Sequence, residues 1–188
     1  MEYLQTGLFL VLSYLLGSIP FGLILTKMAG LGDIRAIGSG SIGATNVLRT
    51  GSKKLALATL ILDGGKGALA LLLFGSNPWY LLAAILGHNF PVWLKFKGGK
   101  GVATTFGGLL VLNPLLALCC GVTWLLTAII SRISSLSAII AGIAMPIFGF
   151  FLDENVIALL ILSVLAIYRH KSNIQRLLKG EEPKIGKK

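Results

Sequence analysis

Seven strongly apolar runs divide this 188-residue chain, and they constrain its fold more than any other feature. A helix needs about 20 apolar residues to cross the hydrocarbon of a bilayer. Several runs fall short of that length, and 102–112 reaches only about 16 Å as a helix, so we expect a partial or tilted span there. Hydrophobic residues make up 55% of the chain and charged residues 13%, which is typical of an integral membrane bundle. The runs lie at 4–26, 55–74, 79–94, 102–112, 114–131, 135–151 and 154–168.

The distribution of positive charge predicts the orientation of these spans. The formal net charge of +10 could indicate nucleic-acid binding, but the basic residues gather in the gaps between apolar runs. With seven spans and the N-terminus outside, the inside connections and the tail hold Lys and Arg, whereas the outside connections hold only the acidic Asp153 and Glu154. This pattern indicates membrane topology rather than a DNA-binding surface.

The stretch 102–131 could form one span or two. One span would place Arg132 and the basic tail outside, against the positive-inside bias, and Asn113-Pro114 supplies a turn signal. We therefore predict an all-α integral membrane protein, a bundle of about seven transmembrane helices with the N-terminus outside and the C-terminus cytoplasmic. Residues 1–188 are expected to form a single polytopic domain.

Small residues predict local features within the runs. Gly17, Pro20 and Gly22 predict a kink or a close helix contact in the first run. The adjacent Cys119 and Cys120 have no metal-ligand spacing around them and are expected to be packing residues.

A glycine- and hydroxyl-rich segment at 38–50, GSGSIGATNVLRT, is the first candidate site. Gly38, Gly40 and Gly43 match G-x-G-x-x-G, but a dinucleotide site needs a βαβ unit and the flanks here are membrane helices. The glycines still let backbone N–H groups approach an anion, and Arg49 can grip two phosphate oxygens. A flexible basic connection is the alternative. Further short donors are Ser39, Ser41, Thr45 and Asn46.

A second segment, FKGGKGVA at 96–103, has the same character. It is not a Walker A loop, because no Gly-Lys-Ser/Thr follows at the required spacing. Lys97 and Lys100 flank two glycines, and the loop leads into a helix at Val102, where backbone amides and ammonium groups form an anion site. The alternative is that these lysines only set the orientation of the spans in the membrane. That role does not require glycines, so the two glycines favour an anion site.

Ionisable residues also lie inside the apolar runs. Asp63 and Lys66 are about one helical turn apart, and each would cost about 2.5–3.5 kcal/mol unpaired at the bilayer centre. We expect a structural ion pair, with a catalytic pair as the alternative. His88 and Asn89 are expected to make an interhelical hydrogen bond or, less favoured, to contact substrate.

A third basic cluster, YRHKSNIQRLLKG at 168–180, follows the last run. His170, Asn173 and Arg176 recur at helical spacing and so share one face. His170 could be a solvated residue, a base or a substrate-positioning donor.

Several kinds of catalytic motif are absent from the sequence. There is no G-x-S-x-G elbow, no carboxylate pair at metal-binding spacing and no Cys/His cluster. We therefore expect no metal, no cofactor and no protein nucleophile. Chemistry at such a site needs a substrate that is already activated and carries a good leaving group.

Taken together, these segments resemble the bacterial acyl-phosphate:glycerol-3-phosphate acyltransferases, the PlsY family. The resemblance covers nearly the whole chain and implies transfer of a fatty acyl group from acyl phosphate to the 1-hydroxyl of glycerol 3-phosphate. The products are 1-acylglycerol 3-phosphate and phosphate. It also implies a seven-span enzyme of the bacterial inner membrane with a cytoplasmic active site, membrane lipids around it and no obligate protein partner. The matching strings are GSGSIGATNVLR at 38–49, DGGKG at 63–67, GHNFPVWLKFKGGKGVAT at 87–104 and RHKSNIQRLLKGEEPKIG at 169–186.

The resemblance also implies roles for individual residues. It gives Ser39 and Arg49 an essential part, and it gives the glycine loop a part in binding glycerol 3-phosphate, through Lys97, Gly98, Gly99, Lys100 and Gly101. It maps the last motif onto His170, Asn173 and Glu182, although the adjacent Glu181 leaves the glutamate uncertain by one residue.

The residue patterns and the family resemblance lead to one hypothesis. Motif one would bind the acyl phosphate, and the glycine loop would hold glycerol 3-phosphate with Ser135 as a further donor. Either His170 or the departing phosphate accepts the proton of the attacking hydroxyl. The alternatives are a small transporter of phosphorylated solutes and a structural protein that binds anionic headgroups. The motif-one donors are Ser39, Gly40, Gly43, Thr45, Asn46 and Arg49.

Overall fold

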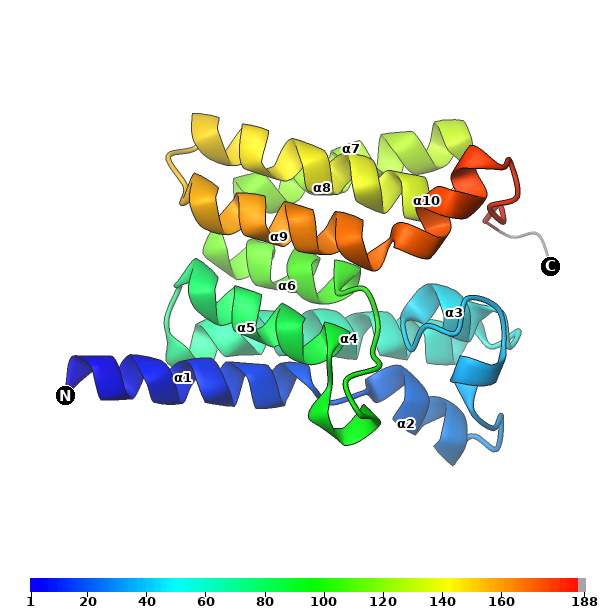
Figure 1. The fold of residues 1–188 in the computed structure, drawn as a ribbon, viewed down its shortest axis with the longest axis horizontal. Coiled ribbons are helices and arrows are strands. Elements are labelled where there is room, and N and C mark those ends of the chain that lie inside the picture. Colours follow the sequence, from blue (N-terminus) through cyan, green and yellow to red (C-terminus); the bar gives the residue numbers. More distant parts are fainter. Residues whose placement is uncertain (186–188) are drawn as a thin grey trace. The chain divides into compact units, whose positions relative to one another are not determined.

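The computed structural model describes residues 1–185, and every regular element within them is a helix, as predicted. Two compact units make up the chain, Met1–Leu112 and a second unit from Asn113 onward. In chain order the elements are α1 (Glu2–Gly17), α2 (Phe21–Met28), η1 (Ile34–Ala36), α3 (Ala44–Leu48), α4 (Lys53–Phe74), α5 (Pro78–Asn89), η2 (Val92–Leu94), α6 (Val102–Leu112), α7 (Pro114–Ser131), α8 (Ser134–Phe151), α9 (Val156–Arg169) and α10 (Lys171–Leu178) (Figure 1).

Four segments among residues 1–185 are long and apolar enough to cross a membrane: α1 with α2, α4, α7 and α8. The pair α9 and α10, bent by 60°, would be a fifth. The multi-pass character is therefore confirmed. Helices also form in the two remaining apolar runs, but α5 has 12 residues and α6 has 11, so the count of seven spans stays a prediction.

The first apolar run is broken, as its glycines and proline predicted. Helix α1 ends at Gly17, and Pro20 is the N-cap of α2. A Cβ on Gly17 would overlap the backbone of Ala84 in α5, and a Cβ on Gly22 would overlap the carbonyl of Ile42. Glycine at these positions therefore allows the close backbone contacts of a membrane bundle.

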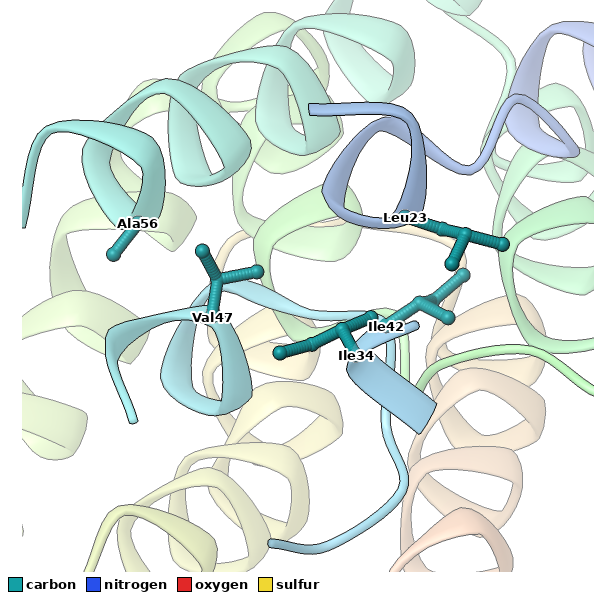
Figure 2. Close-up of a cluster of buried hydrophobic side chains, with 5 residues drawn as sticks. All are labelled: Leu23, Ile34, Ile42, Val47 and Ala56. Atoms are coloured by element: carbon teal, nitrogen blue, oxygen red, sulfur yellow. The ribbon is translucent and has the colours of Figure 1, made fainter. Parts of the chain in front are cut away.

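Five buried side chains anchor the long connection between α2 and α4. Leu23, Ile34, Ile42, Val47 and Ala56 are at most 8% exposed and form one cluster (Figure 2). Because they come from α2, η1, α3, α4 and the segment before α3, the cluster fixes the first predicted site segment against the helices.

The second unit packs α8 against both α7 and α9. Asn113 is the N-cap of α7, and its Oδ1 accepts from the backbone N–H groups of Leu115 and Leu116 at 3.0 Å. Its Nδ2 donates to Glu154 at 2.8 Å. The Asn113-Pro114 signal thus marks a true helix boundary, and 102–131 forms two helices as predicted.

Candidate active site

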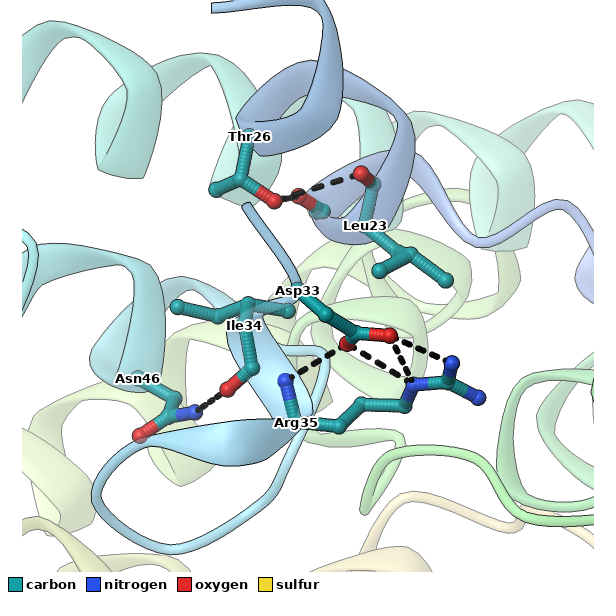
Figure 3. A network of polar contacts seen from close by, with 7 residues as sticks. Leu23, Thr26, Asp33, Ile34, Arg35 and Asn46 are labelled. Atoms are coloured by element: carbon teal, nitrogen blue, oxygen red, sulfur yellow. Dashed lines mark hydrogen bonds and ion pairs between the residues drawn. The ribbon is translucent and has the colours of Figure 1, made fainter. Parts of the chain in front are cut away.

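Asn46 organises the first predicted segment from inside. Its side chain is buried, and Nδ2 lies 2.9 Å from the carbonyl of Ile34, 3.1 Å from that of Ile37 and 2.8 Å from that of Ser41. Figure 3 shows the bond to Ile34. Its Oδ1 accepts from the backbone N–H of Ser39 at 3.1 Å. Asn46 was predicted to be a substrate donor, but its side-chain amide instead bonds with the backbone of the loop that carries Ser39.

The loop turns at two glycines. Gly38 and Gly40 have φ of +56° and +67°, in the left-handed region that favours glycine. A Cβ on Gly38 would overlap the guanidinium of Arg49, so the arginine lies directly over the turn. Ser39 and Arg49 are both exposed. The structure thus brings Arg49, at the C-cap of α3, next to the exposed loop that carries Ser39.

The remaining residues of motif one surround the short helix α3. Gly43 is its N-cap, and the N–H of Gly43 donates to the Ser41 hydroxyl at 3.3 Å. Thr45, in the first turn of α3, is exposed. Position 41 therefore contributes to the shape of the loop.

A basic groove of about 500 Å³ lies beside this region, and sequence reasoning missed it. It is lined by Lys27, Arg35, Lys95 and Lys97 together with Trp93 and two leucines. Arg35 is held by Asp33, whose Oδ1 accepts from Nε at 2.9 Å (Figure 3). The hydrogen bond from the Arg35 side chain holds the pKa of Asp33 well below its ordinary value. Lys27 belongs to α2, Arg35 belongs to η1, and the other two lysines follow η2, so only the fold reveals that these bases share a groove.

The glycine loop folds back onto the end of α5. The N–H groups of Gly98 and Gly99 donate to the carbonyls of Asn89 at 3.2 Å and His88 at 3.0 Å. Gly101 has φ +79°, and a Cβ there would lie 2.9 Å from a methyl group of Ile85. Glycine is therefore required at the point where the loop enters α6.

The two lysines of this loop differ in exposure. Lys97 is exposed and lines the basic groove, whereas Lys100 is half-buried. Helix α6 begins at Val102, as predicted, so the loop does lead into a helix N-terminus. Cations and helix-start amides are thus close together in the sequence segment where anion binding is expected.

Asp63 and Lys66 form the expected ion pair, with Nζ and Oδ1 2.8 Å apart and both side chains almost fully buried. Lys66 also lies 2.8 Å from Nδ1 of His88, which confirms the interhelical hydrogen bond predicted for that histidine. Asn89 is different: its side-chain amide is buried and makes no hydrogen bond with the described residues. The bond expected of Asn89 is therefore not formed within residues 1–185.

In the second unit, Glu182 accepts hydrogen bonds from two of the predicted site residues, Ser135 and Asn173. Its Oε1 accepts from the hydroxyl of Ser135 at 2.7 Å and from Nδ2 of Asn173 at 2.6 Å. Its Oε2 accepts from Nε of Arg176 at 2.7 Å. Glu182 is only 6% exposed, whereas Glu181 is exposed. Glu182, rather than Glu181, therefore makes these contacts, and its role in the family motif stays a prediction.

His170 stands at the bend between α9 and α10 and is 2% exposed. Its Nδ1 lies 2.7 Å from the carbonyl of Ala166. A carbonyl can only accept, so Nδ1 is the donor in this contact. Asn173, on the next helix, has its Oδ1 buried without a hydrogen bond from the described residues. The predicted pair thus occupies a buried helix junction rather than a solvated surface.

Within residues 1–185, no group of three or more His, Cys, Asp or Glu side chains could hold a metal ion.

Comparison with known proteins identifies the family. A model of the glycerol-3-phosphate acyltransferase family matches residues 7–180. The glycerol-3-phosphate acyltransferase of Paramagnetospirillum magneticum is 60% identical over 187 residues, covering 93% of this chain and 91% of that protein. The one from Allorhizobium ampelinum is 54% identical, covering 95% and 91%.

Solved structures agree. The crystal structure of PlsY, an integral membrane glycerol 3-phosphate acyltransferase, in its glycerol 3-phosphate form has a TM-score of 0.87 at 38% identity. Its lysophosphatidic acid form has a TM-score of 0.85 at 37% identity. Each comparison covers 95% of this chain and 94% of the solved one. The chain therefore belongs to the glycerol-3-phosphate acyltransferase family and has the PlsY fold.

Proposed function

We propose that this protein transfers a fatty acyl group from acyl phosphate to the 1-hydroxyl of glycerol 3-phosphate. The observation that carries the proposal is the pair of relatives solved with glycerol 3-phosphate and with lysophosphatidic acid, the acceptor and the product of one acyl transfer. In the reaction, the hydroxyl oxygen forms an ester bond with the acyl carbon, and the bond from that carbon to the phosphate oxygen breaks. The products are 1-acylglycerol 3-phosphate and inorganic phosphate.

The first unit supplies anion-binding groups for the two phosphates. Ser39 and Arg49, on the exposed loop shaped by Asn46, bind the acyl phosphate head and stabilise the charge of the leaving phosphate. Gly40 belongs to this loop, Gly43 is the N-cap of α3 and Thr45 lies in the first turn of α3, and we assign all three to the same substrate. The segment Lys97, Gly98, Gly99, Lys100 and Gly101 binds glycerol 3-phosphate, and the ammonium groups of its two lysines supply the positive charge.

We also assign a part in the reaction to His170 and Asn173, because their segment resembles the family motif. Glu182 holds Asn173 and the Ser135 hydroxyl, so these side chains enter the reaction already oriented. The proton of the attacking hydroxyl goes to the leaving phosphate, and His170 positions substrate. Transfer to the phosphate needs no protein base, which suits a donor that is already activated.

The membrane arrangement follows from the charge pattern. We assign the protein to the bacterial inner membrane, with seven spans, an outside N-terminus and an active site facing the cytoplasm. Acyl phosphate enters from the inner leaflet and glycerol 3-phosphate from the cytosol. Membrane lipids are its surroundings, and no obligate protein partner is needed.

The test is purified protein with acyl phosphate and labelled glycerol 3-phosphate, in the presence of a chelator. We expect equal amounts of lysophosphatidate and phosphate, because activated donor and bound acceptor need no metal. Arg49→Ala should lower the rate about 100-fold, as the loss of an electrostatic contact to a leaving group does. Ser76→Ala, in the connection between α4 and α5, should leave it unchanged. Complete inhibition by the chelator, or solute uptake by liposomes without acyl transfer, would refute the proposal.

The same assay separates the two roles of His170. His170→Gln should raise KM for glycerol 3-phosphate and keep most of kcat if the ring positions substrate. A loss confined to kcat would instead make His170 the base.

A further inference from the structure

A buried network lies directly beneath the glycine loop. Lys66 Nζ is 2.8 Å from Oδ1 of Asp63, 2.8 Å from Nδ1 of His88 and 2.9 Å from the carbonyl of Ile19. The ammonium group of Lys66 is thus surrounded by a carboxylate, an imidazole nitrogen and a backbone carbonyl. The side chains of Asp63, Lys66 and His88 are 2%, 1% and 4% exposed. We call these three residues the Lys66 network.

The network joins three separate parts of the first unit. Ile19 lies in the break between α1 and α2, Asp63 and Lys66 lie in α4, and His88 lies in the last turn of α5. The break leaves a backbone carbonyl for Lys66, since an unwound segment in a membrane protein must bond elsewhere. The charge of Lys66 is balanced by Asp63, so removing either partner alone would leave a buried charge.

The network also fixes the imidazole of His88. Nδ1 lies 2.8 Å from Nζ of Lys66 and 3.6 Å from Oδ1 of Asp63, so both partners contact the same edge of the ring. Turning the ring would break these contacts. His88 is therefore a rigid side chain, although it ends a short helix.

The fixed ring touches the glycine loop. A Cβ on Gly99 would overlap Nε2 of His88, and a Cβ on Gly98 would overlap the His88 carbonyl. Gly99 is not among the glycines with positive φ, so space rather than backbone conformation requires glycine there. The N–H of Gly99 donates to the His88 carbonyl at 3.0 Å. Both the backbone and the ring of His88 thus fix the position of the loop at Gly98 and Gly99.

We infer that the Lys66 network is a positioning device for the loop of residues 97–101, and that it sets the affinity for glycerol 3-phosphate. This inference rests on the proposed role of that loop in binding the acceptor. Lys66 holds the ring of His88, and this ring packs against Gly99. The position of Gly99 in turn fixes where the flanking Lys97 and Lys100 lie. None of the three network residues needs to contact substrate, so their loss should change KM for the acceptor more than kcat.

A double-mutant cycle with Gly99→Ala tests this coupling. Gly99→Ala alone should raise KM for glycerol 3-phosphate on the order of tenfold, with little change in kcat, because the new methyl group meets a ring that cannot move. In the His88→Ala background, the methyl group has room. There Gly99→Ala should change KM by less than about twofold, a non-additivity expected of residues in contact.

A second background separates the effect of the buried charges from the effect of the His88 ring itself. The pair Asp63→Asn with Lys66→Met keeps volume and removes both buried charges together, so it avoids the unpaired charge that a single change would create. In this background His88 remains but has lost its contacts with the charged groups of Lys66 and Asp63. Gly99→Ala should again cost little extra KM, because the ring can now yield.

Two controls complete the experiment. Gly65→Ala places the same methyl group on α4, where nothing lies within 4 Å, and should leave KM unchanged. Thermal unfolding in detergent should accompany each variant. A network with only a structural role would lower the unfolding temperature without raising KM for the acceptor, and that result would overturn the inference.

The outcomes separate this inference from the proposed function. If Lys97→Ala and Lys100→Ala leave KM for glycerol 3-phosphate unchanged, the loop does not bind the acceptor and the proposed site is wrong. If those variants raise KM but the Gly99→Ala penalty is the same in all backgrounds, the loop binds the acceptor and the positioning role alone is wrong.

Discussion

At the residue scale, Glu182 illustrates how a family motif and a folded environment specify different things. Burial by itself raises the pKa of Glu182, but the hydrogen bonds from Ser135, Asn173 and Arg176 outweigh it and hold that pKa below its ordinary value. A carboxyl group with a depressed folded-state pKa stabilises the fold at pH above its unfolded pKa of about 4.3. That stabilisation is lost as the pH falls through the folded-state value.

We therefore expect the thermal unfolding midpoint in detergent to fall between about pH 6 and pH 3. Glu182→Gln should lower the midpoint at pH 7 and flatten this acid dependence, since the amide cannot carry the charge that three donors stabilise. The neighbouring exposed Glu181→Gln is the matched control and should keep the wild-type acid dependence. An unchanged pH profile in Glu182→Gln would refute the role of this carboxylate in stability.

At the element scale, the contact between α4 and α6 is made through glycine. A Cβ on Gly107 would overlap the backbone carbonyl of Gly64, and a Cβ on Gly67 would overlap that of Thr104. Backbone cannot yield as a flexible side chain can, so Gly107→Ala should cost about 1–3 kcal/mol by overpacking. For a chain of this size, we expect a drop in the unfolding midpoint of about 2–4 °C for each kcal/mol.

Gly142 in α8 offers the matched control. A Cβ there would meet only the Cβ of Ala166, at an ordinary 3.7 Å. Gly142→Ala should leave the midpoint unchanged or raise it, because alanine favours a helix by about 0.5–1 kcal/mol over glycine. Equal effects of the two substitutions would mean that helix propensity, rather than close packing, governs the contact.

At the scale of the whole molecule, the charge pattern predicts which connections face the cytoplasm. In a background with Cys119 and Cys120 replaced by alanine, Ser76→Cys and Asp153→Cys should react with a membrane-impermeant maleimide in intact cells. Ser52→Cys should react only after permeabilisation. Asp153→Cys that needs permeabilisation would show that residues 102–131 cross the membrane once, and the seven-span prediction would then be wrong.

Sequence patterns were sufficient to predict features that depend on a few neighbouring residues, such as helix breaks, helix starts and ion pairs one turn apart. Glycines and Pro20 located the break in the first span, and Asn113-Pro114 located the start of α7. Asp63 and Lys66 were expected to pair because a charge in hydrocarbon is costly and a partner lies one turn away. The same signals could not count the spans, since α5 and α6 form helices shorter than a bilayer crossing. A single domain for residues 1–188 likewise stays a prediction.

The sequence by itself therefore determined the helical membrane class, the family motifs and the charged segments where anion binding is expected. The tertiary structure alone decided what each polar side chain does: Asn46 turns inward to three carbonyls, Glu182 gathers Ser135 and Asn173, and Lys66 reaches His88. The physical reason is range. Hydropathy and turn propensity act over a few residues, whereas a buried polar group bonds with whichever partner the folded backbone brings to it, here 22 positions away for Lys66 and 47 for Ser135.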